Sequence, residues 1–142
     1  MSKFFFDTNV LLDLVIPARP QHGFAAELFR EIAARGDGRV LLLASSLKDV
    51  YYIFNRHYGD EQTARKVISQ MRASFEVVEL TLCVVDDALC SNEPDYEDAL
   101  VRAAAENVRC DYIVSRDEKA FRASCCKRVD ARQALALLAV SR

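Results

Sequence analysis

The sequence predicts an α/β protein in which a mostly parallel sheet is covered by helices on both faces. Two observations predict this class. Short apolar segments alternate with amphipathic helical segments along the chain, and Val40–Ala44 is apolar without interruption, as in a strand buried on both faces. Strands that alternate with helices favour a parallel sheet, because each connection must return to the other end of the sheet. With 142 residues, we expect a single domain over residues 1–142.

Short apolar runs bounded by turn-forming residues predict the strands. Residues 3–6 read Lys-Phe-Phe-Phe and lead into Asp-Thr-Asn, while residues 111–115 contain Tyr-Ile-Val. Residues 75–82 alternate loosely between apolar and polar side chains, and Val129 marks the remnant of a last strand. In chain order, the strands are expected at residues 3–6, 40–44, 75–82, 111–115 and around 129.

Apolar residues that recur every three or four positions predict the helices between these strands. The first such stripe ends at Gly36, a residue type that commonly follows a helix end. The next begins at Leu47, has Ser45 and Ser46 before it as candidate N-caps, and is broken at Gly59-Asp60. In chain order, the helices are expected at residues 22–35, 47–58 and 61–73, from about 86, and at 95–107, 117–123 and 131–139.

Four aspartates fall at one edge of the predicted sheet. Asp7 follows the first strand, and Asp117 lies just beyond the strand at 111–115. Asp49 and Asp98 lie in the first turns of two of the predicted helices. In a parallel sheet, the carboxyl ends of the strands and the amino ends of the following helices share the edge where ligands bind. We therefore expect the four carboxylates to converge on one rim.

Converging carboxylates predict a metal site. Clustered carboxylates repel one another and are costly to remove from water, and a bound cation relieves both penalties. Ligands that are all oxygen favour Mg²⁺ or Mn²⁺, which can activate water and stabilise charge on the leaving oxygen of a phosphodiester. We expect Asp7, Asp98 and Asp117 to be the metal ligands, with Thr8 or Asn9 orienting the first carboxylate or a metal-bound water.

Each of these acids also has a purely structural interpretation. Ser46-x-x-Asp49 resembles a capping box, and Asp95-x-x-Asp98 is a similar helix-start pattern. Asp7 and Asp117 can equally be residues that end strands. The remaining residues that attract attention are expected to have ordinary roles: caps or surface charges for Asp13, Asp86, Asp87 and Asp95, surface or helix-end positions for His22 and His57, and core packing rather than base stacking for Tyr51 and Tyr52.

Composition limits the classes of function. A net charge of −2 argues against a protein that grips nucleic acid by bulk positive charge, but it allows a nuclease whose acidic site is offset by bound ions. Apolar runs are too short to span a bilayer, and the early apolar run contains Asp7 and Asp13, unlike a secretory signal. We therefore expect a soluble, cytoplasmic protein without a membrane partner. Five cysteines without C-x-x-C spacing and only two histidines do not predict a zinc cage.

The segments that carry the four acids resemble the motifs of PIN domains, in the same order and over nearly the entire chain. The opening segment reads FDTNVLLD, and the segment of the second acid reads SSLKDVYYI. The third reads DYEDAL and is followed by three alanines, and the fourth reads DYIVSRD with a phenylalanine four residues later. In chain order, these segments are Phe6–Asp13, Ser45–Ile53, Asp95–Leu100 and Asp111–Asp117.

This resemblance implies a three-layer α/β/α sandwich and Mg²⁺- or Mn²⁺-dependent cleavage of single-stranded or structured RNA by water attack on the phosphodiester. It implies that Asp7, Asp98 and Asp117 are metal-site acids and that Asp49 completes the catalytic set. A PIN domain of this length is similar to VapC-type toxins, which usually form homodimers and are silenced by a small cognate antitoxin. Many of those toxins have Glu at the second position, so the shorter Asp49 is expected to act through water or to support the site.

Two other functions fit parts of the pattern. A PIN-like module that binds RNA or a protein without cutting would share these segments, although all four acidic positions are filled here. A receiver-type phosphoacceptor domain also combines a doubly wound fold with an acidic Mg²⁺ pocket. Such a domain needs an acidic pair after its first strand and a Lys near its last strand. Here Asp7 has no adjacent acid, and Arg116-Asp117 occupies the late position.

Overall fold

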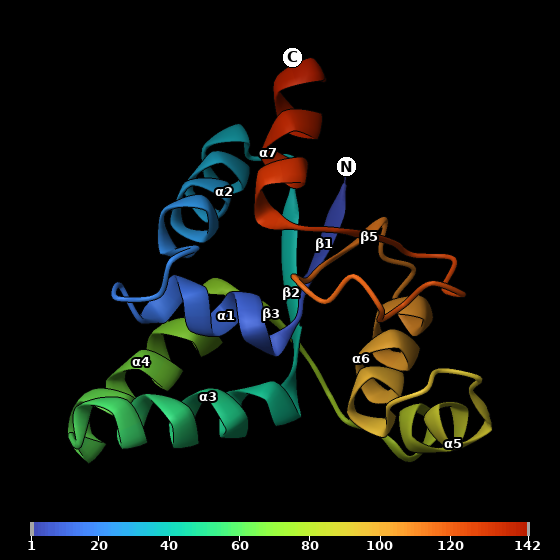
Figure 1. Cartoon of the computed structure of the whole chain (residues 1–142), viewed down its shortest axis with the longest axis horizontal. Helices are drawn as coiled ribbons and strands as arrows, with labels where there is room; N and C mark the ends of the chain where they lie inside the picture. Colours follow the sequence, from blue (N-terminus) through green and yellow to red (C-terminus); the bar gives the residue numbers. More distant parts are fainter. Residues whose placement is uncertain (1, 142) are drawn as a thin grey trace.

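The chain folds around a parallel sheet with β1 at its centre (Figure 1). The structure is a computed structural model that describes residues 2–141. Over these residues the sheet has five strands in the order β3-β2-β1-β4-β5, and every neighbouring pair is parallel. The strands are β1 (Lys3–Phe6), β2 (Arg39–Leu43), β3 (Glu76–Val78), β4 (Tyr112–Val114) and β5 (Lys127–Val129).

Seven helices in the described residues connect these strands and cover both faces of the sheet. Among residues 2–141, none of them is long and apolar enough to cross a membrane. In chain order they are α1 (Thr8–Val15), α2 (His22–Arg35), α3 (Ala44–Tyr58), α4 (Glu61–Ser74), α5 (Leu82–Cys90), α6 (Tyr96–Asn107) and α7 (Ala131–Val140).

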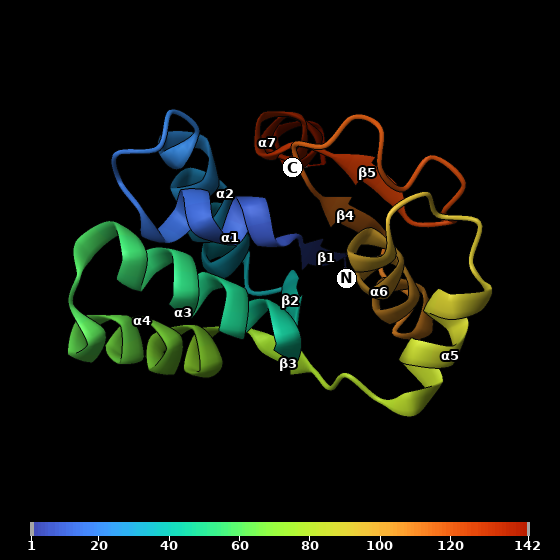
Figure 2. The same cartoon turned by 60° about the horizontal axis from the view of Figure 1, so that its bottom comes forward.

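The alternating side chains of β1 divide the core into two halves. Phe4 and Phe6 belong to a buried cluster that includes residues of α1, α2, α3, α4 and α7, whereas Phe5 belongs to a cluster with α5 and α6. Figure 2 shows the same division, with α5 and α6 on one side of the strands and α1 to α4 on the other. The molecule is therefore a three-layer α/β/α sandwich, which confirms the predicted fold class.

The strand order creates a switch point beside β1. The chain leaves β1 toward β2 and β3, and it later returns to the opposite side of β1 to form β4 and β5. The ladder between β1 and β4 continues past the strand ends, where the backbone N–H of Asp7 donates to the carbonyl of Val114 at 2.9 Å. In open α/β sheets, ligands bind outside the carboxyl ends of the strands at such a switch point. Asp7 lies at that place.

Two glycine positions confirm the predicted helix ends. Gly36 follows α2 with φ 73°, and Gly59 follows α3 with φ 64°. Both lie in the left-handed region, which other residues enter at a cost because of their Cβ atom.

Several predicted boundaries are wrong. The turn expected after Asp7 is the start of α1, a helix of only eight residues, which is too short to show a clear helical repeat in the sequence. α3 begins at Ala44, directly after β2, so Ser45 and Ser46 are not caps but belong to its first turn. α5 begins earlier than expected because Thr81 caps it, with its side chain accepting from the Val84 N–H. The expected helix at 117–123 is a series of turns, in which Phe121 has φ 65°.

Asp13 is buried, which corrects its prediction as a cap or surface charge. Its side chain in α1 is 3% exposed, and two arginines compensate its charge. Arg19 Nε lies 2.8 Å from one carboxylate oxygen, and Arg116 Nε lies 2.7 Å from the other. This ion pairing joins α1 to the loop before α2 and to the loop after β4. A buried carboxylate is tolerated when it is paired in this way.

Asp13→Asn should lower the free energy of unfolding by about 1–3 kcal/mol. Asparagine keeps the shape but loses the charge-assisted bonds to Arg19 and Arg116, whose side chains are exposed enough to regain water. Urea unfolding measures the change, with Asp86→Asn on the exposed face of α5 as the matched control. Equal midpoints for the two variants would contradict a stabilising role for this ion pair.

Candidate functional site

Asp7 is a buried carboxylate held in one orientation. It directly follows β1 and caps α1, and one of its oxygens accepts from the Thr8 backbone N–H at 2.9 Å. The other oxygen accepts from the Ser115 hydroxyl at 2.8 Å and from the Asn9 amide at 3.5 Å. The residue is 6% exposed. Asn9 and the Thr8 backbone thus orient the first carboxylate, which is one of the two roles expected of these residues.

Ser115 connects the ends of the two central strands. Its fully buried hydroxyl donates to Asp7 and accepts from the Asn9 amide at 3.4 Å and from the Asp117 backbone N–H at 3.2 Å. A hydroxyl has one donor and two acceptor sites, so these three bonds use its full capacity. Asn9 also accepts from the Arg116 backbone N–H at 3.3 Å. The loop that carries Asp117 is therefore fixed against the residues that hold Asp7.

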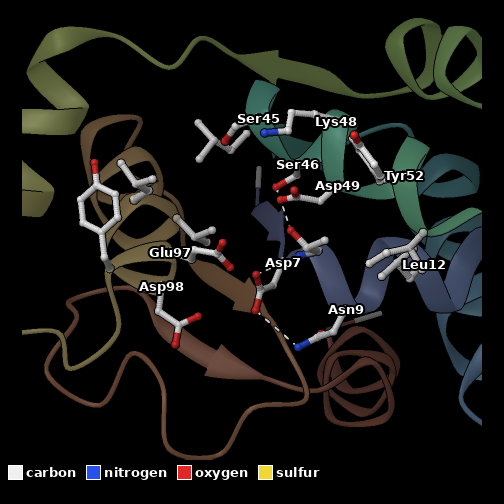
Figure 3. Close-up of a pocket in the computed structure, with 16 residues that line it drawn as sticks. Asp7, Asn9, Leu12, Ser45, Ser46, Lys48, Asp49, Tyr52, Glu97 and Asp98 are labelled. Carbon is white, nitrogen blue, oxygen red and sulfur yellow. Dashed lines mark hydrogen bonds between the residues drawn. The ribbon is translucent and has the colours of Figure 1, made fainter.

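Asp98 lies across the cleft from Asp7, in the first turn of α6. The cap of this helix is Asp95, whose side chain accepts from the Asp98 backbone N–H at 3.1 Å. The cap interpretation therefore applies to Asp95, as predicted, and the Asp98 carboxylate is left to face the cleft. Figure 3 shows it on the wall opposite Asn9, with Asp7 between them.

Asp49 faces the same cleft from α3. Because α3 begins at Ala44, Asp49 lies in its second turn, and the capping-box interpretation with Ser46 is wrong. Ser46 is instead buried and accepts from the Thr8 hydroxyl at 3.0 Å, which joins α3 to the start of α1. Asp49 lies beside Ser46 in Figure 3, half-buried and directed toward the Asp7 side of the cleft.

One cleft of about 600 Å³ thus brings together three of the four predicted acids, a size typical of ligand sites. Asp117 is exposed and lies at the margin, outside the residues that line the cleft. One of its carboxylate oxygens accepts from the Lys119 backbone N–H at 2.9 Å. Its negative charge nevertheless contributes to the raised pKa values of Asp7 and Asp98.

The acids of the cleft raise one another's pKa values. Burial, together with the negative charges of Asp7, Asp95 and Asp117, raises the pKa of Asp98 to about 7. Burial also raises the pKa of Asp7, although its hydrogen bonds from Ser115 and Thr8 oppose this rise. Burial and like charges both disfavour an ionised carboxylate. Ionising all the acids of the cleft is therefore unfavourable unless a positive charge lies nearby.

The donor chemistry of the cleft fits a hard divalent cation. Its walls offer carboxylate oxygens, and the described residues that line it include no cysteine or histidine; such oxygen ligands favour Mg²⁺ or Mn²⁺. As the side chains stand, no three His, Cys, Asp or Glu residues within 2–141 are grouped closely enough to enclose an ion. The fit therefore rests on the oxygen donors and on the repulsion that raises the pKa of Asp98, which a divalent cation would relieve.

Sequence reasoning missed several residues of this site. Glu97 lines the cleft and adds negative charge near Asp7, but an exposed acid in the first turn of a helix carries no distinguishing signal. Glu93 has a buried side chain that pairs with Arg102 at 3.4 Å and accepts from the Phe121 backbone N–H at 3.0 Å. These bonds hold the turn after Asp117, and they depend on tertiary contacts.

Asp98→Asn should stabilise the protein in EDTA at pH 8. The pKa of Asp98 is about 7 in the folded protein against an ordinary 3.8, so its contribution to stability is present below about pH 4 and is lost as the pH rises through 7. Asparagine avoids this loss. The variant should exceed wild type by on the order of 1 kcal/mol at pH 8, after allowance for solvent screening, and should lose its advantage near pH 4.

Denaturant unfolding at both pH values measures this effect. The matched control is Thr81→Ala, which removes the uncharged cap of α5 and should cost about 1 kcal/mol at either pH. If Asp98→Asn behaved like that control, the carboxylates would not repel one another across the cleft.

Comparison with known proteins agrees with this geometry. A family model described as "PIN domain" matches residues 3–119, a span that includes all four predicted acids. No curated protein matches the chain. The family match covers most of the chain and is independent of the cleft geometry.

Solved structures share the fold at low sequence identity. VapC20 of Mycobacterium tuberculosis, a sarcin-ricin loop cleaving toxin, is 19% identical with a TM-score of 0.65, and the match covers 80% of this chain and 89% of that one. A toxin–antitoxin complex from Klebsiella pneumoniae is 19% identical with a TM-score of 0.63, over 89% and 96% of the two chains. A Pyrobaculum aerophilum protein is 17% identical with a TM-score of 0.66, over 98% and 96%. With the family match over residues 3–119, the chain belongs to the PIN-domain family.

Proposed function

We propose that the protein is a metal-dependent endoribonuclease in which water attacks the phosphodiester of RNA. The observation that carries this proposal is the convergence of Asp7, Asp49 and Asp98 on one cleft at the carboxyl edge of the sheet. Membership of the PIN-domain family supports it. A set of surface charges with no joint function would have no reason to gather where their pKa values are raised.

Asp7, Asp98 and Asp117 are the residues assigned to hold Mg²⁺ or Mn²⁺. When bound, such an ion supplies Lewis-acid stabilisation of charge on the phosphate and lowers the pKa of the attacking water. Asp7 is suited to a fixed ligand because its hydrogen bonds leave it little freedom to turn. Asp98 is suited to an adaptable one, since its carboxylate is not used as a helix cap.

Asp49 is assigned a different role. Its carboxylate comes from α3, on the wall that faces α6, and Ser46 beneath it is already engaged by Thr8. We assign Asp49 to orienting the attacking water and accepting its proton. In this role Asp49, whose side chain is shorter than that of Glu, contacts the water and not the metal. Loss of this residue should therefore be less damaging than loss of a metal ligand.

The same proposal extends to the biological role of the protein. It shares its fold with VapC20 and with a toxin–antitoxin complex, so we propose that it is the toxin of a type II toxin–antitoxin pair. In this role it would form a homodimer and be silenced by a small cognate antitoxin. The toxin role is separate from the nuclease activity and needs its own test.

Purified protein should cleave single-stranded RNA in Mg²⁺ or Mn²⁺ and should lose this activity in EDTA. Asp7→Asn, Asp98→Asn and Asp117→Asn should each lower turnover by on the order of 10²-fold or more, because each removes charge that positions metal and water. Asp49→Asn should lower it less. Cleavage of a labelled oligonucleotide measures these rates, and Asp86→Asn on α5 is the control expected to match wild type.

Two outcomes would count against the proposal. Full activity after rigorous chelation would exclude the metal mechanism. A protein that binds RNA but cuts none in either metal would instead be a non-catalytic PIN module.

Expression of the intact chain alone in a bacterium should slow growth, and expression of Asp7→Asn should not. The reason is that a toxin acts through its nuclease activity, which the substitution removes while leaving the shape of the side chain unchanged. Growth curves at matched protein levels make the comparison. Normal growth with a verified active nuclease would point to a housekeeping role and would remove only the toxin assignment.

A further inference from the structure

Two exposed tyrosines line the acidic cleft from opposite sides. Tyr52 on α3 is 66% exposed, and Tyr96, the first residue of α6, is 47% exposed. Figure 3 shows Tyr52 on the α3 wall, on the side of the cleft away from Asp98. Large aromatic side chains usually bury most of their surface, so a pair left open beside a catalytic site needs an explanation.

The exposure of Tyr52 shows that the prediction of core packing for both Tyr51 and Tyr52 is wrong for Tyr52. Tyr51 is partly buried against the core, and its hydroxyl donates to Glu61. Tyr52 points elsewhere, because neighbouring residues on a helix diverge, and its ring meets Tyr51 only edge-on at 6.2 Å between centroids. In the described part of the chain, no hydrogen bond restrains the hydroxyl of Tyr52 or Tyr96. Their open rings are therefore free to contact a ligand.

The charges of the cleft oppose the binding of RNA, which favours a contribution to affinity that does not depend on charge. Asp7, Asp49, Asp98 and Glu97 line it, and among its described lining residues only Lys48 is basic. Lys48 is exposed and lies one helical turn before Tyr52. A net charge of −2 gives no bulk attraction for phosphate. Stacking of bases on aromatic rings does not depend on charge and tolerates any base sequence.

We propose that Tyr52 and Tyr96 are base-stacking residues that hold unpaired nucleobases on the two sides of the acidic site, while Lys48 contacts a neighbouring phosphate. This inference rests on the proposed nuclease function and defines its substrate as single-stranded RNA with splayed bases. α3 and α6 cover opposite faces of the sheet. An RNA chain that contacts both tyrosines must therefore pass over the carboxylates between them. Duplex RNA does not expose its base faces and is not accepted.

The test measures binding of a short single-stranded RNA in EDTA, where no cleavage occurs. The RNA carries 2-aminopurine, a fluorescent base whose emission falls when it stacks on an aromatic ring. Tyr52→Ala and Tyr96→Ala should each weaken binding by about 5- to 100-fold and reduce the quenching. Tyr52→Phe and Tyr96→Phe keep the ring and should restore both. Tyr58→Ala is the matched control, because Tyr58 is a 45% exposed tyrosine of α3 that lies outside the cleft.

Two further measurements separate the roles of the walls. In Mn²⁺, the alanine variants should lose activity through KM more than through kcat, since they bind bases rather than the reacting phosphate. Lys48→Gln should reduce the slope of log Kd against log salt by about 0.7, the value for one contact with a single strand.

The outcomes distinguish this inference from the proposed function. If wild type cleaves RNA and both alanine variants bind and quench like wild type, the stacking role is wrong and the nuclease stands. If wild type binds and quenches but never cleaves, the stacking role stands and the nuclease is wrong. Equal binding of a hairpin stem, or no binding of single-stranded RNA either in EDTA or in Mn²⁺, overturns the stacking role directly.

Discussion

The hydrogen bond from the Ser115 hydroxyl to the buried Asp7 carboxylate is the interaction on which the rest of the site depends. It joins the carboxyl ends of β1 and β4 at the switch point of the sheet. Burial alone would drive Asp7 toward its neutral form, and the bonds from Ser115 and Thr8 offset only part of that cost. Asp7 is thus fixed in position but short of positive charge, which is the condition that makes a cation favourable there.

The topology supplies part of the missing charge. α1 starts at Asp7, and the first turns of α3 and α6 also line the cleft, so three helix N-termini converge on it. Each N-terminus carries a partial positive charge from its free backbone N–H groups. This effect decays within a turn, and it leaves the pKa of Asp98 raised to about 7. Helix dipoles therefore lower the cost of ionising the carboxylates in the cleft, but they do not neutralise their charge.

The sheet and the edge at which the acids meet were predictable from the sequence, because alternation of strands and helices determines a parallel topology. The environment of Asp13 was not, since Arg19 and Arg116 reach it only after the chain has folded. The exposure of Tyr52 was within reach. Asp49 lies opposite the apolar stripe of its helix, and Tyr52 three residues later shares its face. Applying that periodicity to the tyrosine pair would have separated Tyr51 from Tyr52.

An acidic protein that cuts RNA has to solve two opposed problems. The carboxylates that would gather a metal also repel the phosphate that must approach them, and the single lysine among the described cleft residues cannot cancel four acids. The two proposals together resolve this conflict. A cation neutralises the carboxylates, and base stacking on Tyr52 and Tyr96 supplies binding energy that does not depend on charge. The cation and the RNA then favour each other's binding. The cation removes the repulsion between the carboxylates and the phosphate, and the phosphate offers the cation further oxygen ligands. Coupling of this kind is reciprocal, so bound RNA must raise the affinity for the metal by the same factor as the metal raises the affinity for RNA.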